Sequence, residues 1–178
     1  MPSGTSHGFF SSKNWQLKSA LRIIFGIVWG IDGAMKFSPG LPDVFPGMVS
    51  NAAAGQPAWL APWFGFWAAQ SAINPVFWVY LVGVLELALA FSLIFGFMRK
   101  IGYVGGFILS LFIWAVPEGF GGPYGPGSTD IGTGIIYALV FISLMIINAG
   151  YGTSKYSLDA LIEKRWPAWR KVSEFSWL

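Results

Sequence analysis

The chain has 178 residues, of which 54% are hydrophobic, 18% aromatic and 11% charged, with a mean hydropathy of +0.58. Soluble domains have about a quarter charged residues, so this composition predicts a one-domain membrane protein. The chain has no Cys, and its only His, His7, lies in a polar tail; an iron–sulfur cluster, a thiolate metal site or a bis-histidine haem held wholly by this chain is therefore excluded.

The first apolar segment, 17–37, is long enough to cross a membrane and yet contains charged side chains. Gly26 and Gly30 have the G-x-x-x-G spacing that lets two helices approach closely. Asp32 and Lys36 are one helical turn apart on one face, which predicts an ion pair near the membrane boundary. Separate snorkelling of the two end charges is the alternative.

An aromatic segment follows a proline-rich one. Residues 38–56 contain three prolines, which predict repeated breaks in any helix. The next stretch, 57–73, is apolar and rich in Trp and Phe, but with Pro62 inside it is only a marginal span. We expect an interfacial or re-entrant helix on the membrane surface, with rings such as Trp63 and Trp67 at headgroup level.

The second span is expected over 75–98, long enough at about 1.5 Å per residue to cross a hydrocarbon core of about 30 Å. Glu86 lies near its middle. An ionised carboxylate at that depth costs at least about 2.5 kcal/mol, so we expect Glu86 to be protonated or paired. It is a candidate proton acceptor, cation partner or quinone-carbonyl ligand, and a structural hydrogen bond to another helix is the alternative.

A very short turn at Arg99-Lys100 leads into the third span, 101–116, so the second and third spans are expected to form an antiparallel hairpin. The fourth span covers 131–149. We expect Asp130 to cap its first turn, where a carboxylate meets the positive end of the helix dipole.

The stretch between these spans, 117–130, is dense in Gly and Pro and includes Glu118 and Tyr124. These residues favour a shaped loop whose backbone N–H groups can converge on a ligand. A plain connector between two membrane helices is the alternative.

Residues 1–150 form the expected membrane domain, and 151–178 turn polar and basic. Apolar residues at helical spacing in this tail predict an amphipathic helix on an anionic membrane face, interrupted at Pro167; docking to a cytosolic partner is the alternative. All basic residues except Lys36 fall on one side of a four-span arrangement. The positive-inside rule then places both termini in the cytoplasm of a plasma or inner membrane.

The expected fold is thus an all-α membrane protein, a four-transmembrane-helix bundle with an extracytoplasmic interfacial helix and a cytoplasmic amphipathic C-terminal helix. In this arrangement the aromatic segment and the Gly/Pro loop meet on the outer face, with Glu86 beneath them. We expect the functional site there.

Several of these stretches together resemble the DoxX/DoxD family. The stretches are Arg22-Ile23-Ile24-Phe25-Gly26 through Asp32-Gly33-Ala34-Met35-Lys36, Gly55-Gln56-Pro57 with Trp59 and Pro62-Trp63, Glu86, and Glu118-Gly119-Phe120-Gly121-Gly122-Pro123-Tyr124 leading to Thr129-Asp130-Ile131-Gly132. The resemblance covers about residues 17–150. The 118–132 stretch and the Gly-Gln-Pro segment resemble the DoxD-type large subunit of thiosulfate:quinone oxidoreductase.

The resemblance implies that thiosulfate is oxidised to tetrathionate and that electrons pass to the membrane quinone pool, together with a small DoxA-type partner. Coupling two thiosulfate dianions needs cations, and the outer face offers only Lys36 with loop N–H groups, which favours a partner that supplies more. We expect Glu86, Lys36 and Glu118 as catalytic candidates. The expected quinone-binding rings are Trp63, Trp67, Trp114 and Tyr124.

An accessory transmembrane subunit of a larger oxidase or monooxygenase, without its own catalytic centre, is the competing hypothesis. A small-solute transporter is weaker, because no inverted repeat is evident. In either of the first two cases we expect membrane lipids and other membrane subunits as partners, a diffusible quinone as electron acceptor, no metal site, and no nucleic acid.

Overall fold

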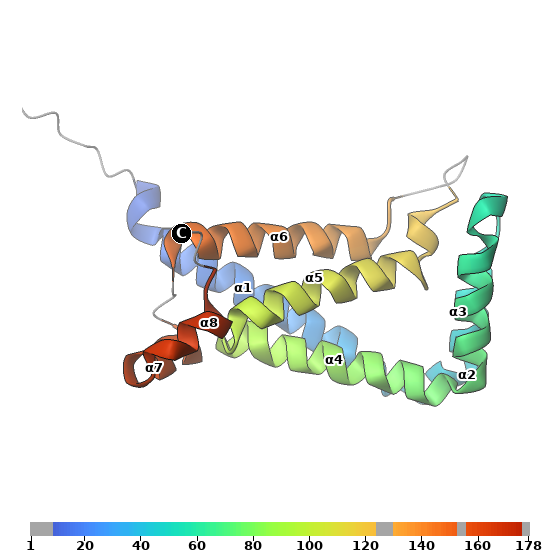
Figure 1. The fold of residues 1–178 in the computed structure, drawn as a ribbon, viewed down its shortest axis with the longest axis horizontal. Coiled ribbons are helices and arrows are strands. Elements are labelled where there is room, and N and C mark those ends of the chain that lie inside the picture. Colours follow the sequence, from blue (N-terminus) through green and yellow to red (C-terminus); the bar gives the residue numbers. More distant parts are fainter. Residues whose placement is uncertain (1–8, 124–129, 153–155, 176–178) are drawn as a thin grey trace, which may run out of the picture.

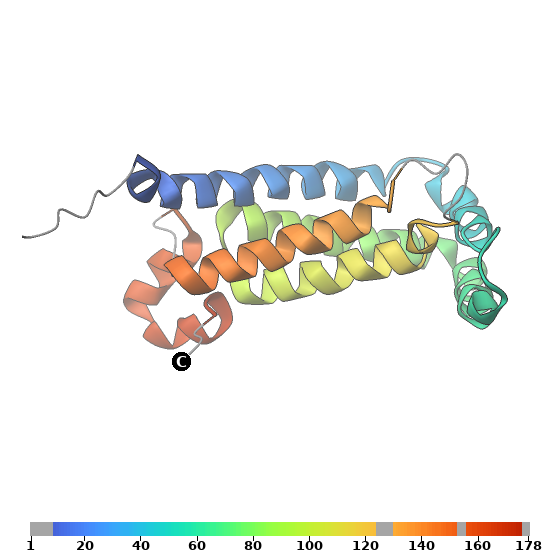
Figure 2. The ribbon, with the colours of Figure 1, turned by 90° about the horizontal axis from the view of Figure 1, so that it is seen from above.

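The computed structural model describes residues 9–123, 130–152 and 156–175, with side chains from residue 16 onward except that of Tyr151. These residues contain eight α-helices, three short 3-10 helices and no strand. Four long helices lie side by side, and the shorter ones gather at the two ends (Figures 1 and 2). The all-helical prediction is confirmed for this part of the chain.

The long helices are α1 (Phe9–Met35), α4 (Pro75–Phe95), α5 (Arg99–Ala115) and α6 (Thr133–Tyr151). They alternate in direction along the bundle (Figure 1), with α1 packed mainly against α4 and α5 mainly against α6. Two of them, α4 and α6, are long and apolar enough to cross a membrane.

The shorter helices lie at opposite ends of the bundle. One end holds α2 (Leu41–Asn51), α3 (Ala61–Ile73) and the 3-10 helices Ala58–Leu60 and Gly119–Gly121. The other end holds α7 (Leu158–Arg165), the 3-10 helix Pro167–Trp169 and α8 (Arg170–Ser173). Helix α3 lies across the end of the bundle, roughly perpendicular to the long helices (Figure 1).

The proline-rich stretch after α1 is helical, so the expected repeated breaks are wrong. Pro42 is the second residue of α2, where a missing N–H costs no intrahelical bond, and the helix continues past Pro46. Pro62 likewise lies in the first turn of α3 and Pro75 is the first residue of α4. These prolines therefore mostly mark where helices begin.

Close contact between α1 and α4 depends on glycine. A Cβ at Gly26 would lie 2.8 Å from the Leu93 Cβ, and one at Gly30 would lie 3.5 Å from the Ala90 Cβ. The G-x-x-x-G pair therefore faces α4, which confirms the predicted close approach. Next to it, the Phe25 ring packs against α6, with its centroid 5.0 Å from that of Phe141.

The C-terminal tail folds back onto the bundle through a buried ion network. The fully buried Arg99 lies between carboxylates of the tail: its Nε is 2.8 Å from Asp159, and its Nη2 is 3.6 Å from Glu163 and 3.4 Å from Glu174. Asp159 also accepts hydrogen bonds from the Met98 N–H and the Trp169 indole.

The tail helix α7 has one face turned to the bundle and another that is exposed. The buried side chains of α7 are Asp159 and Glu163, whereas Leu161 is 61% exposed and Trp166 is 58% exposed. The interruption at Pro167 is confirmed, because α7 ends at Arg165.

Candidate functional site

A cavity of about 440 Å³ lies at the α2/α3 end of the bundle. We call it the Lys36 cavity. Its polar wall includes Asp32 from α1, Lys36 just after α1, Glu86 from α4 and Glu118 just after α5. The remaining wall is largely apolar and comes mainly from α2, α4, α5 and the first part of α6. The three residues that the sequence suggested as catalytic therefore line one cavity.

Lys36 joins two carboxylates. Its Nζ lies 3.3 Å from the Asp32 Oδ1 and 3.2 Å from the Glu86 Oε2. The predicted ion pair between Asp32 and Lys36 is thus confirmed. The Glu86 side chain is fully buried, and its Oε1 has no hydrogen-bond partner among the described residues. A buried acceptor without a protein partner is uncommon, which makes Glu86 the strongest functional candidate in this cavity.

Two glycines bring this pair together. A Cβ at Gly83 would lie 2.8 Å from the Lys36 Cβ, and a Cβ at Gly33 would lie 3.0 Å from the Glu86 Cβ. Because neither glycine has a side chain, the end of α1 lies directly against α4. The Lys36 ammonium can then reach a carboxylate in the middle third of α4.

Glu118 holds the beginning of α6. Its carboxylate accepts a hydrogen bond from the Thr133 hydroxyl and another, of 2.9 Å, from the Gly134 N–H. This is the positive end of the α6 dipole. Helix α6 begins at Thr133, two residues later than expected, and Asp130 accepts from the N–H of Gly132, the residue before the helix, at 2.7 Å. The expected cap by Asp130 is therefore wrong, and Glu118 supplies the carboxylate.

The aromatic segment and the Gly/Pro loop meet beside the cavity, as expected. The Gln56 amide donates to the Gly119 carbonyl at 2.6 Å. A Cβ at Gly55 would lie 2.9 Å from the Pro123 side chain. The Phe120 ring packs edge-on against Trp114, with centroids 5.2 Å apart.

The predicted tryptophans lie around the same end but attach segments to one another. Trp63 on α3 donates to the Ala115 carbonyl at 2.9 Å, Trp114 donates to the Ile131 carbonyl at 2.8 Å, and the Trp67 ring is 4.8 Å from that of Phe112. The structure does not place these three in the cavity wall. Tyr124 lies outside the described residues.

The rings that line the cavity are Phe45, Phe112 and Tyr137. Tyr137 carried a usable signal in the sequence, since a polar group within an apolar span marks an inward-facing position. Phe45 and Phe112 carried none, because α2 was not expected and Phe112 is one of many apolar residues on α5.

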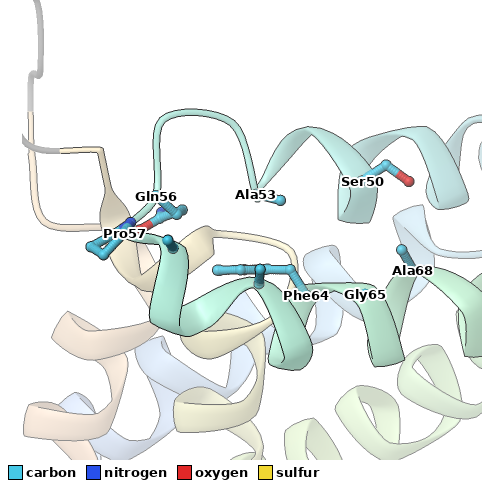
Figure 3. Close-up of a pocket in the computed structure, with 9 residues that line it drawn as sticks. Ser50, Ala53, Gln56, Pro57, Phe64, Gly65 and Ala68 are labelled. Carbon is cyan, nitrogen blue, oxygen red and sulfur yellow. The ribbon is translucent and has the colours of Figure 1, made fainter.

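A second hollow of about 300 Å³ lies between α2 and α3 (Figure 3). Small side chains such as Ser50, Ala53 and Ala68 line it, and the Phe64 ring lies along its floor. Its lining has no ionisable side chain, and its one amide, Gln56, is bonded to Gly119. The Lys36 cavity is therefore the stronger candidate for chemistry.

Within the described ranges, no group of three His, Asp or Glu side chains could hold a metal ion. No family model matches the sequence, and no curated protein and no solved structure is significantly similar to it.

Proposed function

We propose that this chain is a membrane subunit of a thiosulfate:quinone oxidoreductase and that the Lys36 cavity receives the quinone ring. The observation that carries this proposal is Glu86, a buried carboxyl with a free oxygen, beside an ammonium group in a cavity whose wall is largely apolar. The resemblance to DoxD-type subunits suggests the reaction.

The cavity residues fit a quinone ring. Its volume of about 440 Å³ is within the range of small-molecule sites, which combine apolar walls with a few polar groups. When bound, a quinone accepts two electrons and two protons. The Lys36 ammonium can donate a hydrogen bond to a ring carbonyl, Glu86 can hold or deliver a proton, and Phe112 offers an apolar surface to the ring.

The same cavity is unsuitable for thiosulfate. Its single cation, Lys36, already faces Asp32 and Glu86, and Glu118 adds a third carboxylate. A dianion would meet net repulsion there. We therefore assign oxidation of two thiosulfates to one tetrathionate, which releases the two electrons, to a site completed by a small DoxA-like partner.

The proposed setting is a plasma or inner membrane crossed by α1, α4, α5 and α6, with both termini in the cytoplasm. Large apolar side chains are exposed on all four helices, for example Ile24, Phe91, Ile108 and Ile146, which suits contact with lipid. Exposed rings on the crosswise α3, such as Phe66 at 55%, suit the headgroup level of the outer face.

The test is thiosulfate-dependent quinone reduction in membranes that contain the intact complex. We expect Glu86→Gln and Lys36→Ala each to lower the rate by about a hundredfold, because each removes a group that moves a proton or holds the ring. Asp43→Asn is the matched control, an exposed carboxylate of α2 outside the cavity wall. Full activity in both cavity variants would reject the site.

The accessory-subunit alternative also has an observation in its favour. Leu161 and Trp166 are exposed on the tail, whose carboxylates fix it to the bundle, and such side chains suit contact with another subunit. Under this alternative, Leu161→Glu with Trp166→Glu would release the chain from its complex during gentle purification, while the cavity variants would leave turnover unchanged.

A further inference from the structure

An apolar groove of about 440 Å³ lies between α4 and α5. The two helices diverge from their common turn toward the α3 end (Figure 1), and each packs mainly against another helix. The only polar side chain in the lining is Ser92, and its hydroxyl already donates to the Phe97 carbonyl at 2.7 Å. The lining therefore offers no free side-chain polar group to water or to an ion.

The α4–α5 groove and the Lys36 cavity share two of their helices, α4 and α5. Glu86 and Phe112 line the cavity, while Leu89 and Leu109, each three residues away on the same helix face, line the groove. From Leu89 the groove follows α4 to Phe97 at the turn, about 12 Å at the rise of an α-helix. A ligand with a polar ring and an apolar extension matches this sequence of surfaces.

We propose that the α4–α5 groove binds the hydrocarbon tail of an isoprenoid quinone whose ring occupies the Lys36 cavity; this inference rests on the proposed function. The groove borders the outer surface of the bundle, where Phe91 is 47% and Ile101 is 50% exposed. A tail can therefore enter sideways from lipid. Lipid is as apolar as the groove, so burial of apolar surface alone does not favour binding. The close fit of the tail to the groove walls is what makes the groove preferable to lipid.

Gly105 offers a variant that fills the groove without disturbing the fold. It lines the groove, and a Cβ at this position would meet no atom within 4 Å. Gly105→Leu therefore places a side chain in open space. Gly150→Leu is the matched control, because Gly150 is also a helical glycine with open space, but it lies near the end of α6 and lines neither hollow.

The measurement is quinone binding to the full-length chain in lipid nanodiscs, monitored by the quenching of tryptophan fluorescence. Menadione and phylloquinone share one ring and differ in the tail; decylubiquinone and its ring without the decyl chain form a second pair. We expect Gly105→Leu to weaken binding of the tailed quinones about tenfold and to leave the tail-less rings unchanged. Gly150→Leu should bind both as the natural chain does.

The outcomes separate the two proposals. If the rings bind and Glu86→Gln abolishes that binding, but Gly105→Leu binds tailed quinones normally, the groove assignment fails and the proposed function stands. If neither ring of either pair binds the natural chain, both fail. A change in oligomeric state in Gly105→Leu with unchanged quinone binding would make the groove a contact between protein helices and would also overturn the tail assignment.

Discussion

The Glu86 carboxyl and the Lys36 ammonium stabilise the folded protein as a pair. Lys36 neutralises a carboxyl that has no exposed surface, so Lys36→Met leaves Glu86 without a partner. We expect a loss of about 2 kcal/mol, the usual cost of a buried acceptor left without its partner, equivalent to about 4–8 °C in apparent melting temperature for a chain of this length. The double variant Lys36→Met/Glu86→Gln should recover most of that loss, because the coupling disappears with the charge. Additive losses in the thermal melts would contradict the pairing.

Glu174 predicts a pH dependence at the other end of the molecule. Burial, and then repulsion by Glu163, raises the pKa of Glu174 above its ordinary value, although Arg99 acts in the opposite direction. The folded protein therefore holds this proton more tightly than the unfolded chain. The resulting stability is present below the ordinary pKa of a glutamate and is lost as pH rises through the folded value.

Glu174→Gln mimics the protonated side chain at every pH. Its melting temperature relative to the natural chain should therefore increase as pH rises from the acidic side of that transition to neutrality. Melts of both proteins across this range test the sign, and parallel curves would show that burial of Glu174 has no energetic effect.

At the scale of elements, the glycine face of α1 sets its distance from α4. Alanine at Gly26 would place a Cβ 2.8 Å from two side-chain carbons of α4, an overlap that costs about 1–3 kcal/mol. This exceeds the gain of about 0.5–1 kcal/mol from Gly to Ala in a helix. Gly26→Ala should therefore lower the melting temperature in detergent, whereas Gly150→Ala, with open space, should not. Equal effects would argue against close packing of α1 and α4.

The element boundaries show how far periodicity and composition reach. The expected 75–98 and 101–116 correspond closely to α4 and α5, and the fourth span was two residues off at each end. Helix α2 was missed because proline is read as a breaker, although the first turn of a helix tolerates it. Local sequence patterns therefore predict where most long helices lie, but not the residue at which each helix begins.

Side-chain pairs were predictable within one helix but not between helices. The ion pair of Asp32 with Lys36 was predictable, since four residues of helix bring them together. The addition of Glu86 to that pair and the capping of α6 by Glu118 depend on contacts between helices. The inward position of Asp159 and Glu163 was unpredictable for the same reason, because their partner Arg99 is buried at the α4–α5 turn. Helical spacing within the tail gives no information about the position of Arg99.

For the whole molecule, the number of membrane crossings determines which faces meet water. Among the described residues, α4 and α6 alone are long and apolar enough by composition, whereas the four-span proposal adds α1 and the 17-residue α5. The lengthwise arrangement of all four, with α2 and α3 at one end and α7 and α8 at the other (Figure 2), favours four. The two possibilities place the ends of the bundle differently relative to the membrane.

Single cysteines at Ser50 on α2 and Lys164 on α7 distinguish them, because both positions are exposed and the chain has no cysteine of its own. Between them lie α4, α5 and α6, so three crossings put the two labels on opposite sides and two crossings put them on the same side. We expect a membrane-impermeant maleimide to label Ser50→Cys in intact cells and Lys164→Cys only after permeabilisation, since basic residues favour the cytoplasmic side. Labelling of both without permeabilisation would reduce the bundle to two crossings in this region and move the Lys36 cavity out of the lipid-facing arrangement that quinone entry requires.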